Sequence, residues 1–279
     1  MVRIITDSAS DFEVSELKEL MVDCVPLSVN FGDDEHKDNG ELSKNDFFEK
    51  LKNTTEPVKT SQPSLHDIVQ ELEIANSGKD GGVAIFMSSK ISGTANTARI
   101  ACDMTGCKNV YIVDSLTASA GQKLLVEYAV KLRGQGKTAK EIFDGLESVK
   151  SKISLLACLD TLEYLHRGGR VNYTKAMLSA VAHIKPVIRL SGGEVELLAK
   201  SFSIKRGLKS LAQRLEREEL NPHFPLYVMY SDNKSLAKEL AADIKKHLPT
   251  AASVKIMQIG AVIGSHIGPN ACGVAYVKL

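Results

Sequence analysis

Three segments that lie far apart along the chain combine small hydroxyl residues or a histidine with glycine or proline. They are Thr60-Ser61-Gln62-Pro63-Ser64, Ser89-Lys90-Ile91-Ser92-Gly93-Thr94 and Gly264-Ser265-His266-Ile267-Gly268-Pro269. Each is typical of a loop that ends a strand or opens a helix, where N–H groups and hydroxyls can act as donors. No paired acidic residues accompany them, as a Mg²⁺ site would usually require. If the three segments meet, they would form a pocket mouth that holds an anion without a metal.

The segment around Ser92 is expected at a junction between a strand and a helix. In an α/β sheet, ligands gather beyond the carboxyl ends of the strands, where helix N-termini offer free N–H groups. Gly93 would let a ligand approach the backbone closely, and Ser92 and Thr94 would add hydroxyl donors. The simpler alternative is that Ser92 or Thr94 only caps the helix. Thr60 and Ser61 precede a helix predicted to start with a proline, and they carry the same two interpretations.

His266 and Arg170 are the two candidate side chains that could meet a negative charge. Glycine and proline beside His266 indicate an irregular loop, and an imidazole there can donate a hydrogen bond to an anion. Arg170 follows two glycines, and its guanidinium suits a carboxylate or a phosphate, the alternative being a surface arginine at the end of a turn. The other histidines are expected to be structural on helices (His66, His166, His183, His247) or solvated in loops (His36, His223).

A serine hydrolase is the competing enzymatic interpretation. Its candidate residues are Ser92 or Ser115 as nucleophile, His266 as base, and Asp7 or Asp114 as the acid that orients the base. The nucleophile elbow G-x-S-x-G is absent, because Lys90 stands where its first glycine should be. No phosphate-binding G-x-x-x-x-G-K-[ST] loop occurs either. An esterase or thioesterase is therefore the alternative and not the leading hypothesis.

Composition and charge argue against several other classes. The 279 residues carry 35 basic and 34 acidic side chains, and only 5% are aromatic, so nothing favours a nucleic-acid-binding surface. The five cysteines are scattered without a C-x-x-C pair, which indicates reduced thiols and no zinc site. The sequence shows neither a secretion signal nor a run of ~18 apolar residues that could span a membrane. We therefore expect a soluble, cytoplasmic protein.

Apolar periodicity predicts an α/β fold in the first half of the chain. Strands are expected over 2–6, 24–31, 82–87, 110–113 and 153–159, and helices over 11–20, 43–52, 64–77, 93–102, 117–133 and 138–150. The continuous apolar run 82–87 is typical of a strand covered on both faces. Residues 32–40 are predicted as a polar hairpin or excursion and 57–63 as irregular chain. The alternation favours a mostly parallel sheet with flanking helices.

Beyond residue 160 the pattern changes to one typical of a mixed sheet. A helical turn is expected over 162–166, a helix over 173–183, and a hairpin whose strands 186–190 and 195–199 flank Ser191-Gly192-Gly193-Glu194. Helices 204–219 and 233–247 and strands 226–230, 254–259 and 273–277 follow. The sequence thus predicts two α/β domains, an N-terminal one over 1–160 and a C-terminal one with a mixed sheet and helices over 161–279.

Taken together, the motifs resemble those of the DegV family. Eight segments follow in family order from end to end: IITDSASDF, VPLSVNF, TSQPS, SSKISGTANTA, VDSLTASAGQ, LEYLHRGGRVN, KPVIRLSGGEV and IGSHIGPNACGV. Characterised members of this family bind fatty acids and include the FakB subunits of bacterial fatty acid kinase. The resemblance implies two α/β domains around one acyl chain, with its carboxylate at the pocket mouth.

The resemblance also implies roles for single residues. Thr60 and Ser92 match the threonine of T-S-Q-P-S and the serine of S-G-T, which are implied carboxylate ligands. His266 matches the histidine of S-H-x-G-P, and Arg170 matches the arginine of G-G-R, the implied contact for the phosphate of an acyl phosphate. The expected ligand-binding set is completed by Ser61, Gly93 and Thr94.

The leading hypothesis is a lipid-binding protein without chemistry of its own. The implied partner is a separate ATP-dependent fatty acid kinase that converts the bound long-chain fatty acid to an acyl phosphate. No cofactor, metal or nucleic acid is expected, and transient contact with a membrane surface is left open. A fatty acid carrier that never meets a kinase is a further alternative. The chain departs from the family at Ala95, Asn270 and 203–207, positions that bear on chain-length preference and partner docking.

Overall fold

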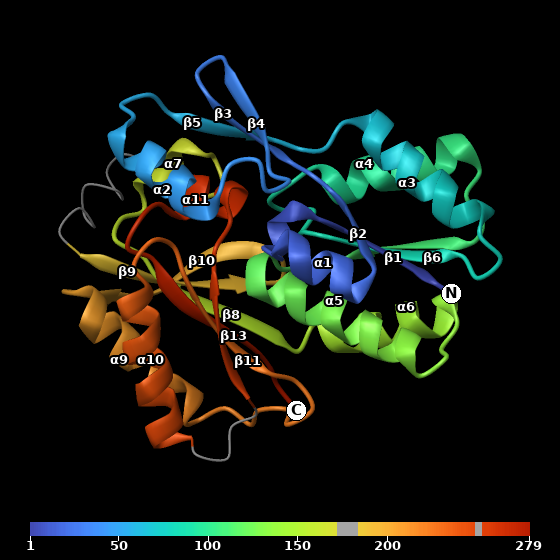
Figure 1. Ribbon diagram of the computed structural model, residues 1–279. Coiled ribbons are helices and arrows are strands. Elements are labelled where there is room, and N and C mark those ends of the chain that lie inside the picture. Colours follow the sequence, from blue (N-terminus) through green and yellow to red (C-terminus); the bar gives the residue numbers. More distant parts are fainter. Residues whose placement is uncertain (172–183, 249–252) are drawn as a thin grey trace.

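The computed structural model describes residues 1–171, 184–248 and 253–279, which form three sheets with flanking helices (Figure 1). Sheet A is parallel throughout, with the strand order β2-β1-β6-β7. Its strands are β1 (Arg3–Asp7), β2 (Val22–Val25), β6 (Gly82–Phe86) and β7 (Val110–Asp114). The parallel sheet predicted for the first half of the chain is confirmed.

Helices cover both faces of sheet A because successive side chains of its strands point to opposite sides. Ile4 and Ile85 pack toward α1, α5 and α6, whereas Ile5 and Phe86 pack toward α3 and α4 (Figure 1). The helix bounds are α1 (Val14–Leu20), α3 (Leu65–Ser77), α4 (Thr94–Thr105), α5 (Ser119–Gly134) and α6 (Ala139–Lys150). All five residues of β6 are buried, which accounts for its continuous apolar run.

Sheet C is mixed, with the strand order β10-β9-β8-β13-β11-β12. Its strands are β8 (Ile153–Cys158), β9 (Lys185–Ser191), β10 (Glu194–Ser201), β11 (Leu226–Tyr230), β12 (Val254–Gln258) and β13 (Cys272–Val277). Only β11 and β12 pair in parallel; the other neighbours are antiparallel. The predicted mixed sheet and the 191–194 hairpin are confirmed.

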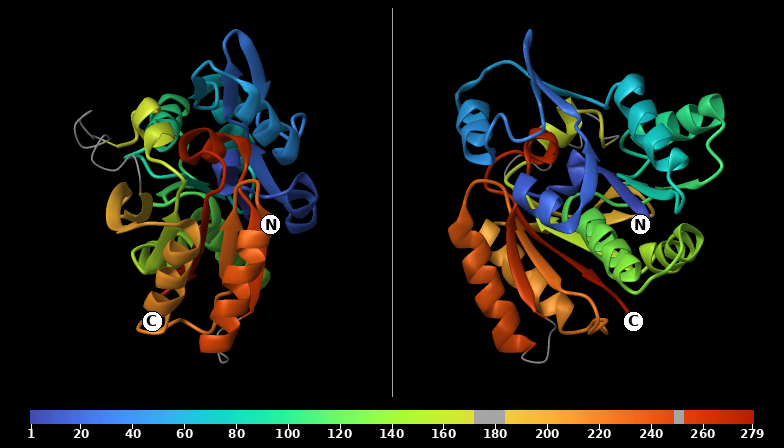
Figure 2. Two further views of the ribbon diagram at one scale, coloured as in Figure 1. Left: turned by 90° about the vertical axis from the view of Figure 1, so that its left-hand side faces the viewer. Right: turned by 45° about the vertical axis from the view of Figure 1, so that its right-hand side comes forward.

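The two faces of sheet C have different neighbours. Leu156 and Cys158 face α9 (Ile204–Leu215) and α10 (Lys234–His247), which cover the outer side (Figure 1). Leu155 and Ala157 alternate with them and face the interior, where α5 runs between sheets A and C (Figure 2). The inner face of sheet C therefore belongs to the largest apolar cluster of the molecule.

A third, antiparallel sheet was not expected from the sequence. It consists of β3 (Ser28–Phe31), β4 (Asp34–Lys37) and β5 (Val58–Ser61), and it lies above α2 (Lys44–Asn53), α7 (Glu163–Arg167) and α11 (Ala261–Ile267) (Figure 1). The strand predicted over 24–31 is in fact split between sheet A and this sheet. Residues 57–63, predicted as irregular, contain the edge strand β5, and His36 lies in β4 and not in a loop.

The start of α2 follows the predicted chemistry, whereas the start of α3 differs from the prediction. The Ser43 hydroxyl accepts the backbone N–H of Asp46 at the start of α2. At α3 the cap is Ser64, which accepts the N–H of Asp67, so Pro63 precedes the helix and does not lie in its first turn as predicted. The helix predicted over 173–183, including His183, lies outside the described residues.

Strand β8 precedes the domain boundary predicted near residue 160, but it belongs to sheet C. It lies in the middle of that sheet, between β9 and β13. The change from one sheet to the other occurs between β7 and β8, along α5 and α6. Within the described ranges, none of the helices is long and apolar enough to cross a membrane.

Candidate functional site

An apolar cavity of about 160 Å³ lies where the carboxyl end of sheet A meets the inner face of sheet C. Sheet A contributes the chain that follows its strands, Met87 after β6 and Ala118 before α5. Its remaining apolar lining is Leu27, Ile91, Leu155, Ala157, Leu165, Ile188, Leu190, Val195, Met229, Ile259, Val262, Ile263 and Ile267. The position agrees with the general placement of ligands beyond the carboxyl ends of parallel strands.

The mouth of this cavity is polar, and four segments distant in sequence supply it. Six of the seven predicted ligand-binding residues line the cavity, namely Thr60, Ser61, Ser92, Gly93, Arg170 and His266. The hydroxyl of Thr60 and Nε2 of His266 are hydrogen-bonded at 2.8 Å, which joins β5 to α11 across 206 residues of sequence. The structure thus brings together the three segments singled out from the sequence.

Thr94 is the exception among the predicted residues. It is fully buried and does not line the cavity. Its hydroxyl lies 2.9 Å from Oγ of Ser92, and its backbone N–H donates to the same oxygen at 3.3 Å. Ser92 thus lines the cavity and accepts the first N–H of α4 from the position before the N-cap, which is Gly93 and makes no side-chain cap hydrogen bond.

His266 lies in helix α11, and not in an irregular loop as predicted. The flanking glycines serve packing: a Cβ on Gly264 would come within 2.7 Å of the Phe47 ring, and one on Gly268 within 2.3 Å of the Tyr164 ring. Gly168 likewise admits the imidazole, since a Cβ there would lie 2.2 Å from its Nδ1. Close packing explains Gly264, whereas Gly268 is needed both for packing and for its positive φ of 73° at the end of α11.

The imidazole of His266 is neutral near pH 7, and one of its two nitrogens makes no hydrogen bond to the described residues. Burial, together with the nearby charge of Arg170, lowers the pKa of His266 to about 4. Its buried Nδ1 has no hydrogen-bond partner among the described residues. A buried polar atom without a partner is costly, and this one lies against Gly168, whereas Nε2 is joined to the cavity-lining Thr60.

Arg170 holds the two sides of the mouth together. Its Nε donates to the backbone oxygen of Ile91 at 3.0 Å, and its Nη1 donates to the oxygen of Gly168. Burial lowers the pKa of Arg170 from its ordinary value, although the group stays charged near neutral pH. The cation therefore lies beside the cavity mouth without a carboxylate partner in the part of the chain that the structure describes.

Gly93 lines the cavity and also makes room for Gln62. A Cβ at this position would lie 2.2 Å from Oε1 of Gln62. Gln62 itself lines the mouth, and its Nε2 donates to Oγ1 of Thr97 in α4 at 2.9 Å. Gln62 is thus a residue of the mouth that sequence reasoning did not include in the ligand-binding set, although it lies within the T-S-Q-P-S motif.

The residues proposed for a serine hydrolase are not arranged as a catalytic triad. Ser115 is buried, and its hydroxyl donates to the backbone oxygen of Thr117 at 3.0 Å. Asp7 accepts the backbone N–H of Met87, so this carboxylate orders the chain after β6 and does not orient an imidazole. Asp114 accepts the N–H of Ser89 in the same manner. This geometry does not provide the base-orienting hydrogen bond of a triad.

The deep part of the cavity contains residues that carried no sequence signal. Ser119, the first residue of α5, lines the cavity, and its hydroxyl donates to the Asp11 carboxylate at 2.5 Å. The same oxygen lies 3.7 Å from the sulfur of Met229.

Ala95, a departure from the family pattern, packs against α3 and not in the cavity. Asn270, another departure, adopts a left-handed conformation (φ 56°) that asparagine tolerates.

Three carboxyl groups near this region make stability depend on pH: Asp7 and Asp11 are buried, and Asp38 is partly exposed. Burial raises the pKa of Asp7 and Asp11 to about 6 and that of Asp38 to about 7. Below these values the folded protein binds protons that the unfolded chain does not yet bind, so the free energy of unfolding rises as the pH falls. His266 acts in the opposite sense, because its unfolded form takes up a proton around pH 6.5 whereas its folded form does so only near pH 4, and this partly offsets the rise.

The free energy of unfolding is therefore expected to rise by about 1 kcal/mol between pH 8 and pH 6.5. Urea denaturation at the two pH values measures it. Asp38→Asn, which removes the carboxyl group with the highest pKa of the three, should reduce the rise by more than half. A free energy of unfolding that is flat or falls over this interval would contradict the assignment.

Comparisons with known proteins agree with this architecture. The chain matches the family model described as "Uncharacterised protein, DegV family" over residues 1–279. It is 32% identical over 277 residues to a DegV domain-containing protein of Halalkalibacterium halodurans, with 99% of this chain and 98% of that protein covered.

Solved structures show the same fold. A DegV family protein from Thermus thermophilus, described for its fatty acid binding, has a TM-score of 0.90 and 26% identity and covers 100% of this chain and 99% of its own. A protein of Thermotoga maritima, described as revealing a fatty acid binding function, has a TM-score of 0.84 and 26% identity with the same coverage. The two α/β units with a parallel and a mixed sheet are those of solved DegV structures.

Proposed function

Because this chain belongs to the DegV family, we propose that it binds a long-chain fatty acid in the apolar cavity and presents the carboxylate to a partner. The partner is a separate ATP-dependent kinase that phosphorylates the bound acid to an acyl phosphate. The chain acts as a cytoplasmic carrier without chemistry of its own. The fatty acid binding described for the Thermus thermophilus and Thermotoga maritima proteins supports the choice of ligand.

The observation that carries this proposal is an apolar cavity that opens onto uncharged hydrogen-bond donors. Each methylene or methyl group that the cavity buries would provide ~0.8 kcal/mol, before the cost of ordering the chain. A carboxylate that follows the chain inward must keep its oxygens hydrogen-bonded. Ser92 supplies one hydroxyl donor, and with the His266 proton on Nε2, which donates to the Thr60 oxygen, the Thr60 hydroxyl is free to donate to the carboxylate.

The guanidinium of Arg170 can stabilise the additional negative charge of an acyl phosphate. An acyl phosphate carries a phosphoryl group in place of one carboxylate oxygen, and a guanidinium matches phosphate oxygens in its fork geometry. Arg170 lies at the mouth and uses Nε and Nη1 for backbone oxygens, which leaves Nη2 for the phosphoryl group. We assign Arg170 as the phosphate contact, Thr60 and Ser92 as the carboxylate contacts, and His266 as the residue that orients the Thr60 hydroxyl.

Native mass spectrometry of the purified protein tests the ligand. We expect a bound species with the mass of a long-chain fatty acid, which denaturation releases and added oleate or palmitate replaces. Protein that is free of ligand and also ignores both added acids would refute fatty acid binding. Incubation of the loaded protein with cell lysate and ATP then tests the kinase: acyl phosphate, trapped as hydroxamate, supports it, whereas unchanged acid favours a carrier that meets no kinase.

A further inference from the structure

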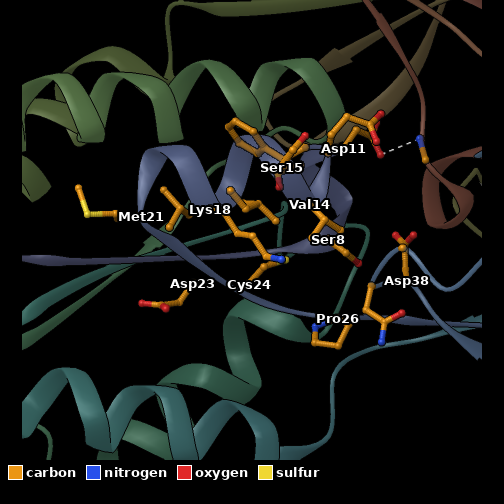
Figure 3. A pocket seen from close by; sticks show the side chains of 18 of the residues that line it. Ser8, Asp11, Val14, Ser15, Lys18, Met21, Asp23, Cys24, Pro26 and Asp38 are labelled. Atoms are coloured by element: carbon orange, nitrogen blue, oxygen red, sulfur yellow. Dashed lines mark hydrogen bonds between the residues drawn. The ribbon is translucent and has the colours of Figure 1, made fainter. Parts of the chain in front are cut away.

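Asp11 lies just outside the wall of the cavity and connects two of its helices. The residue is 2% exposed and adopts a left-handed backbone conformation (φ 58°) after the short helix η1 (Ser8–Ser10). One carboxylate oxygen accepts the backbone N–H of Gly260 at 2.9 Å (dashed line in Figure 3), and the other accepts the hydroxyl of Ser119. A single carboxylate thus joins the N-termini of α11 and α5.

Both helices contribute residues to the cavity. The start of α5 provides Ala118 and Ser119, and α11 provides Val262 and His266 on one continuous helix. Gly260 is the residue before α11, and a Cβ there would lie 2.7 Å from the Asp11 carboxylate. Glycine at 260 therefore permits the contact that fixes where α11 begins and, six residues later, where the imidazole lies.

The opposite side of Asp11 faces a separate polar groove of about 1040 Å³ (Figure 3). Lys44 reaches into this region, and its ammonium donates to the backbone oxygen of Asp11 at 2.9 Å and to that of Gln258 at 3.2 Å. The charged groups around Asp11 are Asp7, Glu13, Asp38, Lys44 and Lys123. Lys44 thus holds the backbone of Asp11 and the end of β12 from the groove side.

We propose that Asp11 is a positioning residue of the fatty acid site, which sets the place of His266 through helix α11 while it holds the start of α5. Asp11 touches neither the cavity nor the ligand. This inference rests on the proposed function of the cavity, but the geometry that it concerns is a property of the protein without ligand. Its consequence is that a substitution at Asp11 changes ligand affinity and the environment of the imidazole together.

The test compares Asp11→Ala, Asp11→Asn and Thr138→Ala in the full chain. In Asp11→Asn the amide oxygen can accept the Gly260 N–H, and the amide NH₂ can donate to Ser119, so both contacts are retained without the charge. Thr138→Ala is the matched control, because it removes a side-chain oxygen that accepts a helix N–H, at Glu141 of α6, remote from the cavity. Affinity is measured with the fluorescent fatty acid cis-parinaric acid, and the imidazole of His266 is followed by its ¹⁵N NMR signals.

We expect Asp11→Ala to bind the probe about 10-fold more weakly and to shift the His266 signals. Asp11→Asn should restore both within about 3-fold, and Thr138→Ala should change neither. Wild-type affinity and wild-type His266 signals in Asp11→Ala would overturn the proposal, as would a folded Asp11→Asn that behaves like the alanine variant.

A second variant keeps the proposal testable if Asp11→Ala does not fold. Gly260→Ala keeps the aspartate at position 11, but the added methyl group pushes its carboxylate away from the start of α11. We expect it to shift the His266 signals, and unchanged signals would overturn the proposal. Absence of probe binding to the unaltered protein would instead count against fatty acid binding, and the His266 signals of the variants would still report on positioning.

Discussion

His266→Ala is expected to weaken the binding of a long-chain fatty acid by about 10- to 100-fold while the protein stays folded. The ring lies at the cavity mouth, where its Nε2 is bonded to the Thr60 hydroxyl and sets which way that hydroxyl points. A hydrogen bond to a charged group contributes about 1.5–3 kcal/mol, which corresponds to this range of affinity. Titration with cis-parinaric acid, and displacement of the probe by palmitate, measure the change.

His166→Ala is the matched control for this experiment. His166 lies in α7, close to the cavity in the fold, but does not line it. The affinity of the His166→Ala variant for the fatty acid should therefore remain within about 2-fold of the wild type. Thr60→Val adds a second arm, because it removes the hydroxyl that is bonded to Nε2 of His266. We expect it to lower the affinity as well, by about 10-fold. Equal affinity in His266→Ala and His166→Ala would contradict a role for the imidazole in holding the carboxylate.

The polar mouth could be predicted from the sequence because its chemistry is local. Ser92-Gly93-Thr94 and the segment around Thr60 combine donors with helix starts, and such combinations can be read without knowledge of the fold. The cap of α2 by Ser43 follows from the same kind of local signal. The position of His266 in α11 was not predicted, because glycines that permit close helix packing resemble glycines that permit loop turns.

The wall of the cavity could not be predicted, since nothing local distinguishes it from a solid core. Leu155 and Ala157 alternate with Leu156 and Cys158 along β8, and all four are apolar and buried. Only the distance between sheet C and the end of sheet A decides which pair faces a cavity. Ser119 carried no signal for the same reason, because its partner Asp11 is 108 residues away in sequence. Tertiary contacts of this kind determine the depth of the site.

Ala157→Phe is expected to weaken the binding of palmitate by at least about 100-fold with little loss of stability. Ala157 lies on β8 with its side chain on the cavity face of sheet C, and only 5% of it is exposed. A phenyl ring would occupy space that an acyl chain needs, and the contacts of several methylene groups would be lost at ~0.8 kcal/mol each. Because the ring fills a cavity that already exists, it avoids most of the cost of overpacking. Probe displacement and thermal denaturation measure the two effects.

A matched pair of smaller substitutions separates a blocked cavity from general damage to sheet C. Ala157 and Ala275 lie on neighbouring strands with their side chains in the same apolar cluster, but only Ala157 lines the cavity. Ala157→Val should weaken binding, most strongly for the longest acids, at nearly unchanged stability. Ala275→Val should cost about 1–3 kcal/mol of stability, because no space is free beside it, and should leave the affinity of the folded protein intact. If instead Ala157→Phe bound palmitate as the wild type does, the acyl chain could not lie against β8, and the cavity between the two sheets would not be its site.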